Sequence, residues 1–117
     1  MPRTSASVDR TLAALADPTR RRVVDLLRLR PRPAGELASA CRMSPPAMSR
    51  HLRVLRSKGL VEEEHTQPQD TRLRIYRLRR RPFTELQQWL QQVEAFWSDQ
   101  LSAFKAQAEN AAKGRTE

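Results

Sequence analysis

The chain has 117 residues, a length that suits one compact domain and is short for two. Only 38% of its residues are hydrophobic and 5% are aromatic, so the core is small or is completed by a partner subunit. Its 22 basic and 13 acidic side chains give a net charge of +9, which favours a polyanionic partner. The charge is uneven: residues 1–81 carry 19 basic and 8 acidic side chains, whereas the remainder is slightly acidic.

The first part of the chain predicts two helices. Residues 1–7 are expected to be disordered, and Val8–Ala16 places its apolar residues on one side. The pair Asp17-Pro18 supplies a cap and a first-turn proline for a second helix that ends near Leu29. Arg20–Arg22 stand in its first turn, where cations oppose the helix dipole, so we expect a negatively charged group nearby.

Two shorter helices follow the break at residues 31–33. Ala34–Cys41 forms the first, with Leu37 and Ala38 inward. Ser44 caps the second, which ends at Gly59. The second helix is buried on one side only, because its apolar residues recur at i, i+4 and i+7: Met48, Leu52 and Leu55. Two short helices joined by a tight turn predict a helix-turn-helix, whose second helix enters the DNA major groove.

The outer face of this recognition helix carries the expected DNA contacts. Arg50 is the first candidate for a base edge, because guanine presents paired acceptors to a guanidinium, and Ser49 lies beside it. Arg53, one turn further on, is expected to meet phosphate, and the helix N-terminus is expected to bind an anion. The DNA-contacting residues predicted on this helix are Ser44, Pro46, Ala47, Ser49, Arg50, Arg53 and Arg56.

A β-hairpin is predicted after the recognition helix. Val61 leads into residues 62–65, and a turn-rich hexapeptide separates them from residues 72–78. The two runs have period-2 character, and their β-formers are Val61, Ile75 and Tyr76. Such a hairpin is a wing, and Arg72 or Arg74 is expected to reach DNA. Tyr76 and Leu78 share the face of these arginines, so the pattern leaves open which set is buried.

Three consecutive glutamates, residues 62–64, lie on the same hairpin. They would repel phosphate, so their strand either lies away from DNA or pairs with arginines.

A long final helix is predicted from Pro82, with an apolar stripe over about six turns. One small domain cannot cover such a stripe, so we expect a homodimer. A core position or a ligand pocket for the aromatic residues is the alternative. The predicted interface consists of Leu12, Leu15, Leu86, Trp89, Leu90, Val93, Phe96, Trp97, Leu101 and Phe104. The ordered domain is expected to span residues 8–107, followed by a disordered tail over 108–117.

No metal, cofactor or catalytic site is predicted. Cys41, His51 and His65 fall on three different elements, without a zinc-like spacing. Ser49 and His51 are two residues apart on a helix, so they form no nucleophile–base pair, and three glycines provide no phosphate loop. With one cysteine, no signal-peptide pattern and no apolar span, a reducing cytoplasm is the expected location and no membrane partner is expected.

Four segments, in this order and spacing, resemble the ArsR superfamily of bacterial winged-helix repressors: LADPTRRRVVDLL, GELA, SPPAMSRHLRVLRSKGLV and RIYRL. The resemblance covers residues 11 to about 104. It implies a five-helix winged domain with a two-stranded wing, homodimeric through its first and last helices, that represses its own operon at a palindromic operator.

The chain departs from the metal-sensing members of that superfamily. Their thiolate motif would fall at Pro33 and Gly35, which cannot ligate, and the last helix has neither His nor Cys. The sequence is similar instead to the metal-independent branch. Pro45 stands where relatives carry Gln, so one amide contact to a base is lost and the operator preference differs.

The sequence therefore predicts a DNA-binding regulator that is not an enzyme. The alternatives are a non-specific architectural nucleic-acid binder, a protein-interaction module that uses the last helix, and a sensor. A sensor would respond to a small ligand between Trp89 and Trp97 or to oxidation of Cys41, and its effector is unknown.

Overall fold

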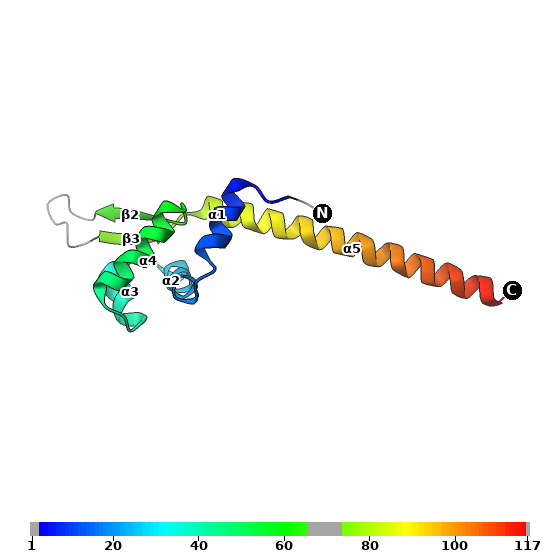
Figure 1. Ribbon diagram of the computed structural model, residues 1–117, viewed down its shortest axis with the longest axis horizontal. Helices are drawn as coiled ribbons and strands as arrows, with labels where there is room; N and C mark the ends of the chain where they lie inside the picture. The colour runs from blue at the N-terminus through cyan, green and yellow to red at the C-terminus, as the bar shows by residue number, and fades with distance from the viewer. Residues whose placement is uncertain (1–2, 66–73, 117) are drawn as a thin grey trace.

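A computed structural model describes residues 3–65 and 74–116 of the chain. The helices and strands are, in order, α1 (Ala6–Ala14), α2 (Pro18–Leu29), β1 (Arg32–Pro33), α3 (Ala34–Ala40), α4 (Pro45–Ser57), β2 (Val61–His65), β3 (Arg74–Leu78) and α5 (Arg80–Thr116). Figure 1 shows α2, α3, α4 and the strands gathered at one end of the molecule, with α5 projecting from them. Five helices and an antiparallel hairpin confirm the predicted winged helix-turn-helix.

The core lies between α2, α3, α4 and the sheet. Its buried side chains come from every one of these elements, with one from α1: Ala14, Val23, Leu27, Leu37, Ala38, Met48, Leu52, Leu55, Leu60, Val61 and Tyr76. The three apolar residues predicted for the inner face of the recognition helix, α4, are all among them. Burying one such side chain is worth about 1.5–3 kcal/mol, so this set fixes how α4 is presented.

A residue with left-handed backbone stands in the turn before α4, and another stands in the turn after it. Arg42, in the connection between α3 and α4, has φ 54°, and the Met43 N–H donates to the Ala38 carbonyl at 3.0 Å. Gly59 follows α4 with φ 82°, and the Leu60 N–H donates to the Leu55 carbonyl at 2.9 Å. Glycine adopts this conformation without a steric penalty, which explains why α4 ends there.

The sheet has three strands in the order β1-β3-β2, one more than the sequence predicted. The additional strand, β1, pairs Arg32 with Tyr76 and Pro33 with Ile75. Prolines in residues 31–33 disfavour a helix and keep the backbone extended. Because β1 is an edge strand, it tolerates a proline, which has no backbone N–H to donate. The sequence did not decide which side chains of β3 are buried, and the structure shows that Tyr76 is, with 8% of its surface exposed.

Two helices have different limits from those expected. α1 begins at Ala6 because the Ser5 hydroxyl accepts from the Val8 N–H at 3.2 Å, and it ends at Ala14 instead of Ala16. α5 continues through residues 108–116, where the sequence analysis expected disorder. This last segment contains three alanines with Glu109, Lys113 and Arg115, residue types that have high helix propensities.

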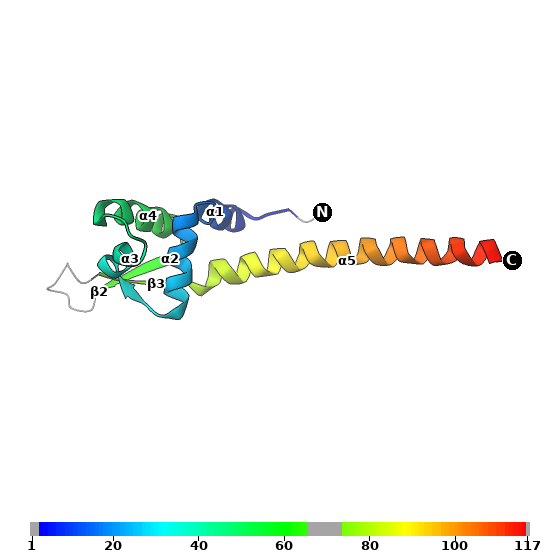
Figure 2. The ribbon, with the colours of Figure 1, turned by 90° about the horizontal axis from the view of Figure 1, so that it is seen from below.

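The molecule is elongated because α5 extends beyond the other elements, as the two perpendicular views show (Figures 1 and 2). Its radius of gyration is 21.6 Å, and its extents are 82 × 26 × 20 Å. A compact domain of this length has a radius of about 13 Å. Within the described ranges, no helix is apolar enough over a sufficient length to cross a membrane.

Candidate nucleic-acid interface

The outer face of α4 carries exposed polar side chains. Ser49, Arg50 and Arg53 are exposed, opposite the buried Leu52. Neither Arg50 nor Arg53 forms a side-chain hydrogen bond or ion pair with residues 3–65 or 74–116. Both guanidiniums therefore keep all their donors available for an external partner. These residues lie where the sequence placed the DNA contacts.

The N-terminus of α4 differs from the expected anion site. Pro45 and Pro46 occupy its first two positions and have no N–H, and the Ala47 N–H donates to the Ser44 hydroxyl at 3.3 Å. The Met48 N–H already bonds to the Ser44 carbonyl. No free backbone donor remains in the first turn, so the expectation that this helix end binds an anion through its N–H groups is wrong. Pro46 is exposed and Ala47 is half-buried, so both remain accessible.

Glu63 of β2 connects the recognition helix to the wing. Its carboxylate lies 2.7 Å from Nη1 of Arg56 on α4 and 3.0 Å from Nε of Arg74 on β3. The Glu63 side chain is only 5% exposed, whereas the arginine side chains are 62% and 49% exposed. Because two cations share one carboxylate, the cluster keeps a net positive charge toward solvent.

The same cluster lines a small cleft of about 120 Å³ between α4 and the sheet, together with Ser49, Arg53 and Tyr76. The structure thus brings four predicted DNA contacts together: Ser49, Arg53, Arg56 and Arg74. Burial, followed by the charge of Glu63, raises the pKa of Tyr76, so its hydroxyl stays protonated. Arg72 lies outside the described residues.

The other glutamates of the triplet also pair with an arginine. Glu62 and Glu64 lie 2.7 Å and 3.3 Å from the guanidinium of Arg77. The hydrogen bond that Arg77 donates to Glu62 is the main cause of the raised pKa of Arg77. Of the two readings offered for residues 62–64, pairing with arginines is confirmed. The role of Glu63 was missed, although its alternation with the buried Val61 places it on the inward face of β2.

The arginines that open α2 hold the end of α1. Nε of Arg20 donates to the Ala14 carbonyl at 2.7 Å, and Nη1 of Arg21 donates to the Leu15 carbonyl at 2.8 Å. These carbonyls lie at the negative end of the α1 dipole. The negatively charged group expected beside residues 20–22 is an acidic neighbour, the Asp17 carboxylate, which lies 4.0 Å from Nη1 of Arg20.

His51 joins α4 to the start of α2. Its Nδ1 lies 3.9 Å from the Asp17 carboxylate, which caps α2 by accepting from the Arg20 N–H at 3.0 Å. That backbone hydrogen bond, with smaller contributions from His51 and the Arg20 charge, lowers the pKa of Asp17. Asp17 thus stays ionised and helps to set the angle at which α4 is held.

The predicted interface residues divide into two sets. Four side chains of α5 are at least half-exposed: Leu90 at 50%, Trp97 at 55%, Leu101 at 67% and Phe104 at 71%. Leu12 of α1 is 40% exposed. Leu86, Trp89, Val93 and Phe96 are half-buried. Leu15 differs from the others because it packs against the core of its own chain.

The described residues contain no group of three or more His, Cys, Asp and Glu side chains that could hold a metal ion. Cys41 is half-buried, and burial raises the pKa of its thiol against the opposing charge of Arg22. A raised pKa disfavours the thiolate, which is the reactive form. This environment gives no support to the reading of Cys41 as an oxidation sensor.

Comparison with known proteins agrees with this geometry. Residues 15–64 match a family model described as a helix-turn-helix domain. The chain is 39% identical over 101 residues to the HTH-type transcriptional regulator Rv2034 of Mycobacterium tuberculosis, covering 86% of this chain and 88% of that protein. It is 36% identical over 50 residues to the transcriptional repressor SdpR of Bacillus subtilis, covering 43% of this chain and 56% of that protein.

A solved structure supports the same assignment. The ArsR-like transcriptional regulator from Rhodococcus sp. RHA1 superposes with a TM-score of 0.75 at 30% identity, covering 90% of this chain and 93% of that one. These similar proteins are transcriptional regulators and not enzymes. The chain therefore belongs to the ArsR family of helix-turn-helix transcriptional regulators.

Proposed function

We propose that this protein is a sequence-specific repressor that binds a palindromic operator in double-stranded DNA as a homodimer and represses its own gene. The observation that carries the proposal is the outer face of α4, where Arg50 and Arg53 are exposed and have no partner within the described residues. The similarity to SdpR, which is named as a repressor, supports repression. The place of action is the cytoplasm.

Base reading is assigned to Ser49 and Arg50, and phosphate contact to Arg53. Arg53, Arg56 and Arg74 line one cleft, so a phosphate group there would meet three guanidiniums. Ser44 contributes through its place at the helix cap, and Pro46 and Ala47 through close approach of the helix start to the groove. Arg72 is assigned to the wing on sequence grounds alone.

The homodimer is inferred from α5. A helix that projects from its domain with Trp97, Leu101 and Phe104 more than half exposed leaves a large apolar stripe in water. Such a patch marks an interaction surface, and a second copy of the same helix offers the matching stripe. Two copies related by a twofold axis would present two α4 helices to successive major grooves of an inverted repeat.

Arg50→Ala tests base reading. We expect a loss of about 1–3 kcal/mol in operator binding and a relaxed preference at one base pair, measured by fluorescence anisotropy on operator variants. Arg28→Ala on α2 is the matched control, because Arg28 is an equally exposed arginine that pairs with Asp25 at 3.6 Å. Unchanged affinity and preference in Arg50→Ala would refute the assigned role.

Competition and salt titration separate a specific regulator from an architectural binder. Operator affinity should fall by orders of magnitude between low and moderate salt, because phosphate contacts release counterions. Random DNA should compete poorly with the operator. Equal competition would favour the architectural binder, and a promoter reporter that does not respond to the protein would contradict autorepression.

A further inference from the structure

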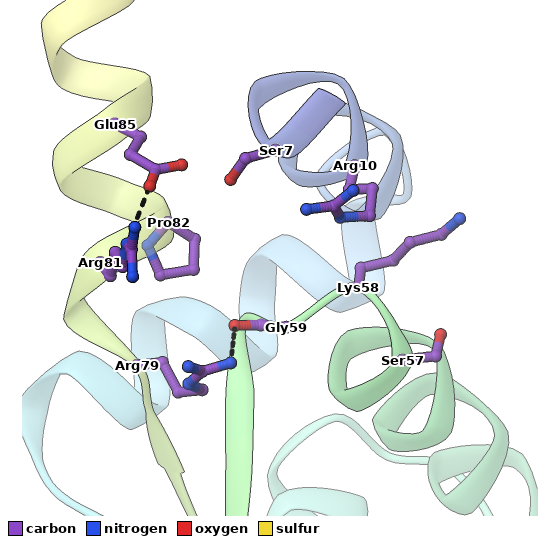
Figure 3. A pocket seen from close by; sticks show the side chains of 9 residues that line it. All are labelled: Ser7, Arg10, Ser57, Lys58, Gly59, Arg79, Arg81, Pro82 and Glu85. Atoms are coloured by element: carbon purple, nitrogen blue, oxygen red, sulfur yellow. Dashed lines mark hydrogen bonds and ion pairs between the residues drawn. The ribbon is translucent and has the colours of Figure 1, made fainter. Parts of the chain in front are cut away.

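A second basic cluster lies away from the recognition face, in a cavity of about 310 Å³ where α1, the end of α4 and the start of α5 meet. Figure 3 shows side chains from all three helices around it. The lining residues are Ser7, Arg10, Ser57, Lys58, Gly59, Arg79, Arg81, Pro82 and Glu85. Four of these carry a positive charge and one carries a negative charge.

The positive charge of this cavity is only partly balanced. Glu85 pairs with Arg81 at 3.1 Å, and the Arg79 guanidinium donates to the Gly59 carbonyl at 3.5 Å. In the described part of the chain, Arg10 and Lys58 form no side-chain hydrogen bond or ion pair. Like charges held together repel each other, and a bound anion would relieve that repulsion.

The single acidic residue is already engaged. Figure 3 shows Ser7 of α1 and Glu85 of α5 facing each other across the cavity. The Ser7 hydroxyl, followed by the Arg81 guanidinium, lowers the pKa of Glu85. Glu85 thus connects α1 to α5, and its charge also interacts with Arg10, so a single carboxylate stands against the four cations that line the cavity.

We propose that this cavity binds a small multivalent oxyanion of the phosphate class, either free phosphate or the phosphate group of a metabolite. The Arg10 and Lys58 side chains, which form no ion pair or side-chain hydrogen bond within the described residues, supply the binding charge. The anion is distinct from operator DNA, because the lining residues lie at the C-terminal end of α4, and Arg50 and Arg53 are not among them.

The position of the cavity makes the anion an effector of the proposed repressor, and this consequence rests on the function proposed above. The anion contacts the end of the helix that reads DNA and the start of the helix that joins two copies. If it binds free and operator-bound protein differently, it changes operator affinity, and the operator changes anion affinity by the same factor.

Isothermal titration calorimetry of the full chain with inorganic phosphate tests the site, with chloride holding the ionic strength constant. We expect saturable binding that weakens at least tenfold in both Arg10→Gln and Lys58→Gln. Glu85→Gln should bind phosphate severalfold more tightly, because it removes the only negative charge in the cavity. A titration of the same variants with a phosphorylated sugar distinguishes free phosphate from a metabolite as the preferred ligand.

Arg50→Gln is the matched control, because Arg50 is an exposed arginine with no partner within the described ranges and lies outside the cavity. It should lose operator affinity and keep phosphate affinity. Saturable phosphate binding with no operator binding would keep the anion site and contradict the repressor. Absence of phosphate binding, an equal loss in Arg50→Gln, or a loss of operator binding alone in Lys58→Gln would overturn the anion site.

Discussion

The winged body (α2, α3, α4 and the sheet) and the projecting part of α5 differ in how much of their apolar surface the chain itself buries. In the body, apolar residues from three helices and two strands bury one another, and the acidic residues of the wing pair with arginines. Along α5, Leu90, Trp97, Leu101 and Phe104 remain exposed. The body holds the recognition helix with its own residues, whereas α5 has apolar surface that the described part of the chain leaves exposed. The proposed DNA reading and the proposed dimerisation therefore fall to separate regions of the chain.

The largest effect is expected in the body. Leu52→Ala removes a side chain that is 1% exposed between α4 and the rest of the core. Its loss leaves a cavity and should lower the free energy of unfolding by about 2–5 kcal/mol. Urea denaturation at several protein concentrations measures this loss, which should be the same at each concentration if the body is self-sufficient.

The second prediction concerns α5. Leu101→Asp places a charge in the exposed stripe and should shift the protein from dimer to monomer in sedimentation equilibrium, with operator affinity reduced at least tenfold. Ser102→Asp adds the same charge to the neighbouring exposed position and is the control. A monomeric wild-type protein, or a variant that remains dimeric, would show that α5 does not join two copies.

The third prediction tests the connection between wing and helix. Glu63→Gln keeps the shape of the side chain but removes the charge shared by Arg56 and Arg74. Because Glu63 is nearly buried and loses two charge-assisted contacts, whereas both arginines reach solvent, the free energy of unfolding should fall by about 1–3 kcal/mol. Operator binding should become more salt-dependent, since both guanidiniums are freed for phosphate. A salt slope equal to that of the wild type would argue against contact of these two residues with DNA.

The smallest effect is expected from the α2 cap. The pKa of Asp17 is lowered in the folded protein, so its contribution to stability is present above the ordinary value of 3.8 and is lost as pH falls below it. Asp17→Asn still caps the helix but does not titrate, so its stability should fall less than that of the wild type between pH 6 and pH 3. Unfolding in urea at both pH values measures the difference, and equal losses in the two proteins would contradict this role.

The sequence alone determined the parts of this protein that depend on local pattern. The i, i+4, i+7 spacing of Met48, Leu52 and Leu55 identified the inner face of α4, because helical periodicity fixes which side chains share a face. Ser44 and Gly59 marked its limits through cap and turn chemistry that depends on neighbouring residues only. The polar face with Arg50 followed from the same periodicity.

Only the tertiary structure decided the features that join distant segments. Nothing local indicates that Glu63 meets Arg56 and Arg74, that Arg20 and Arg21 hold the end of α1, or that Arg10 and Lys58 share a cavity. Electrostatic partners are chosen by proximity in space, and long flexible side chains can reach several alternatives from one position in the sequence. The spacing of apolar residues along the sequence thus determined the helices and their buried faces. The way these helices pack in three dimensions decided which charged side chains are paired and which remain available to bind a ligand.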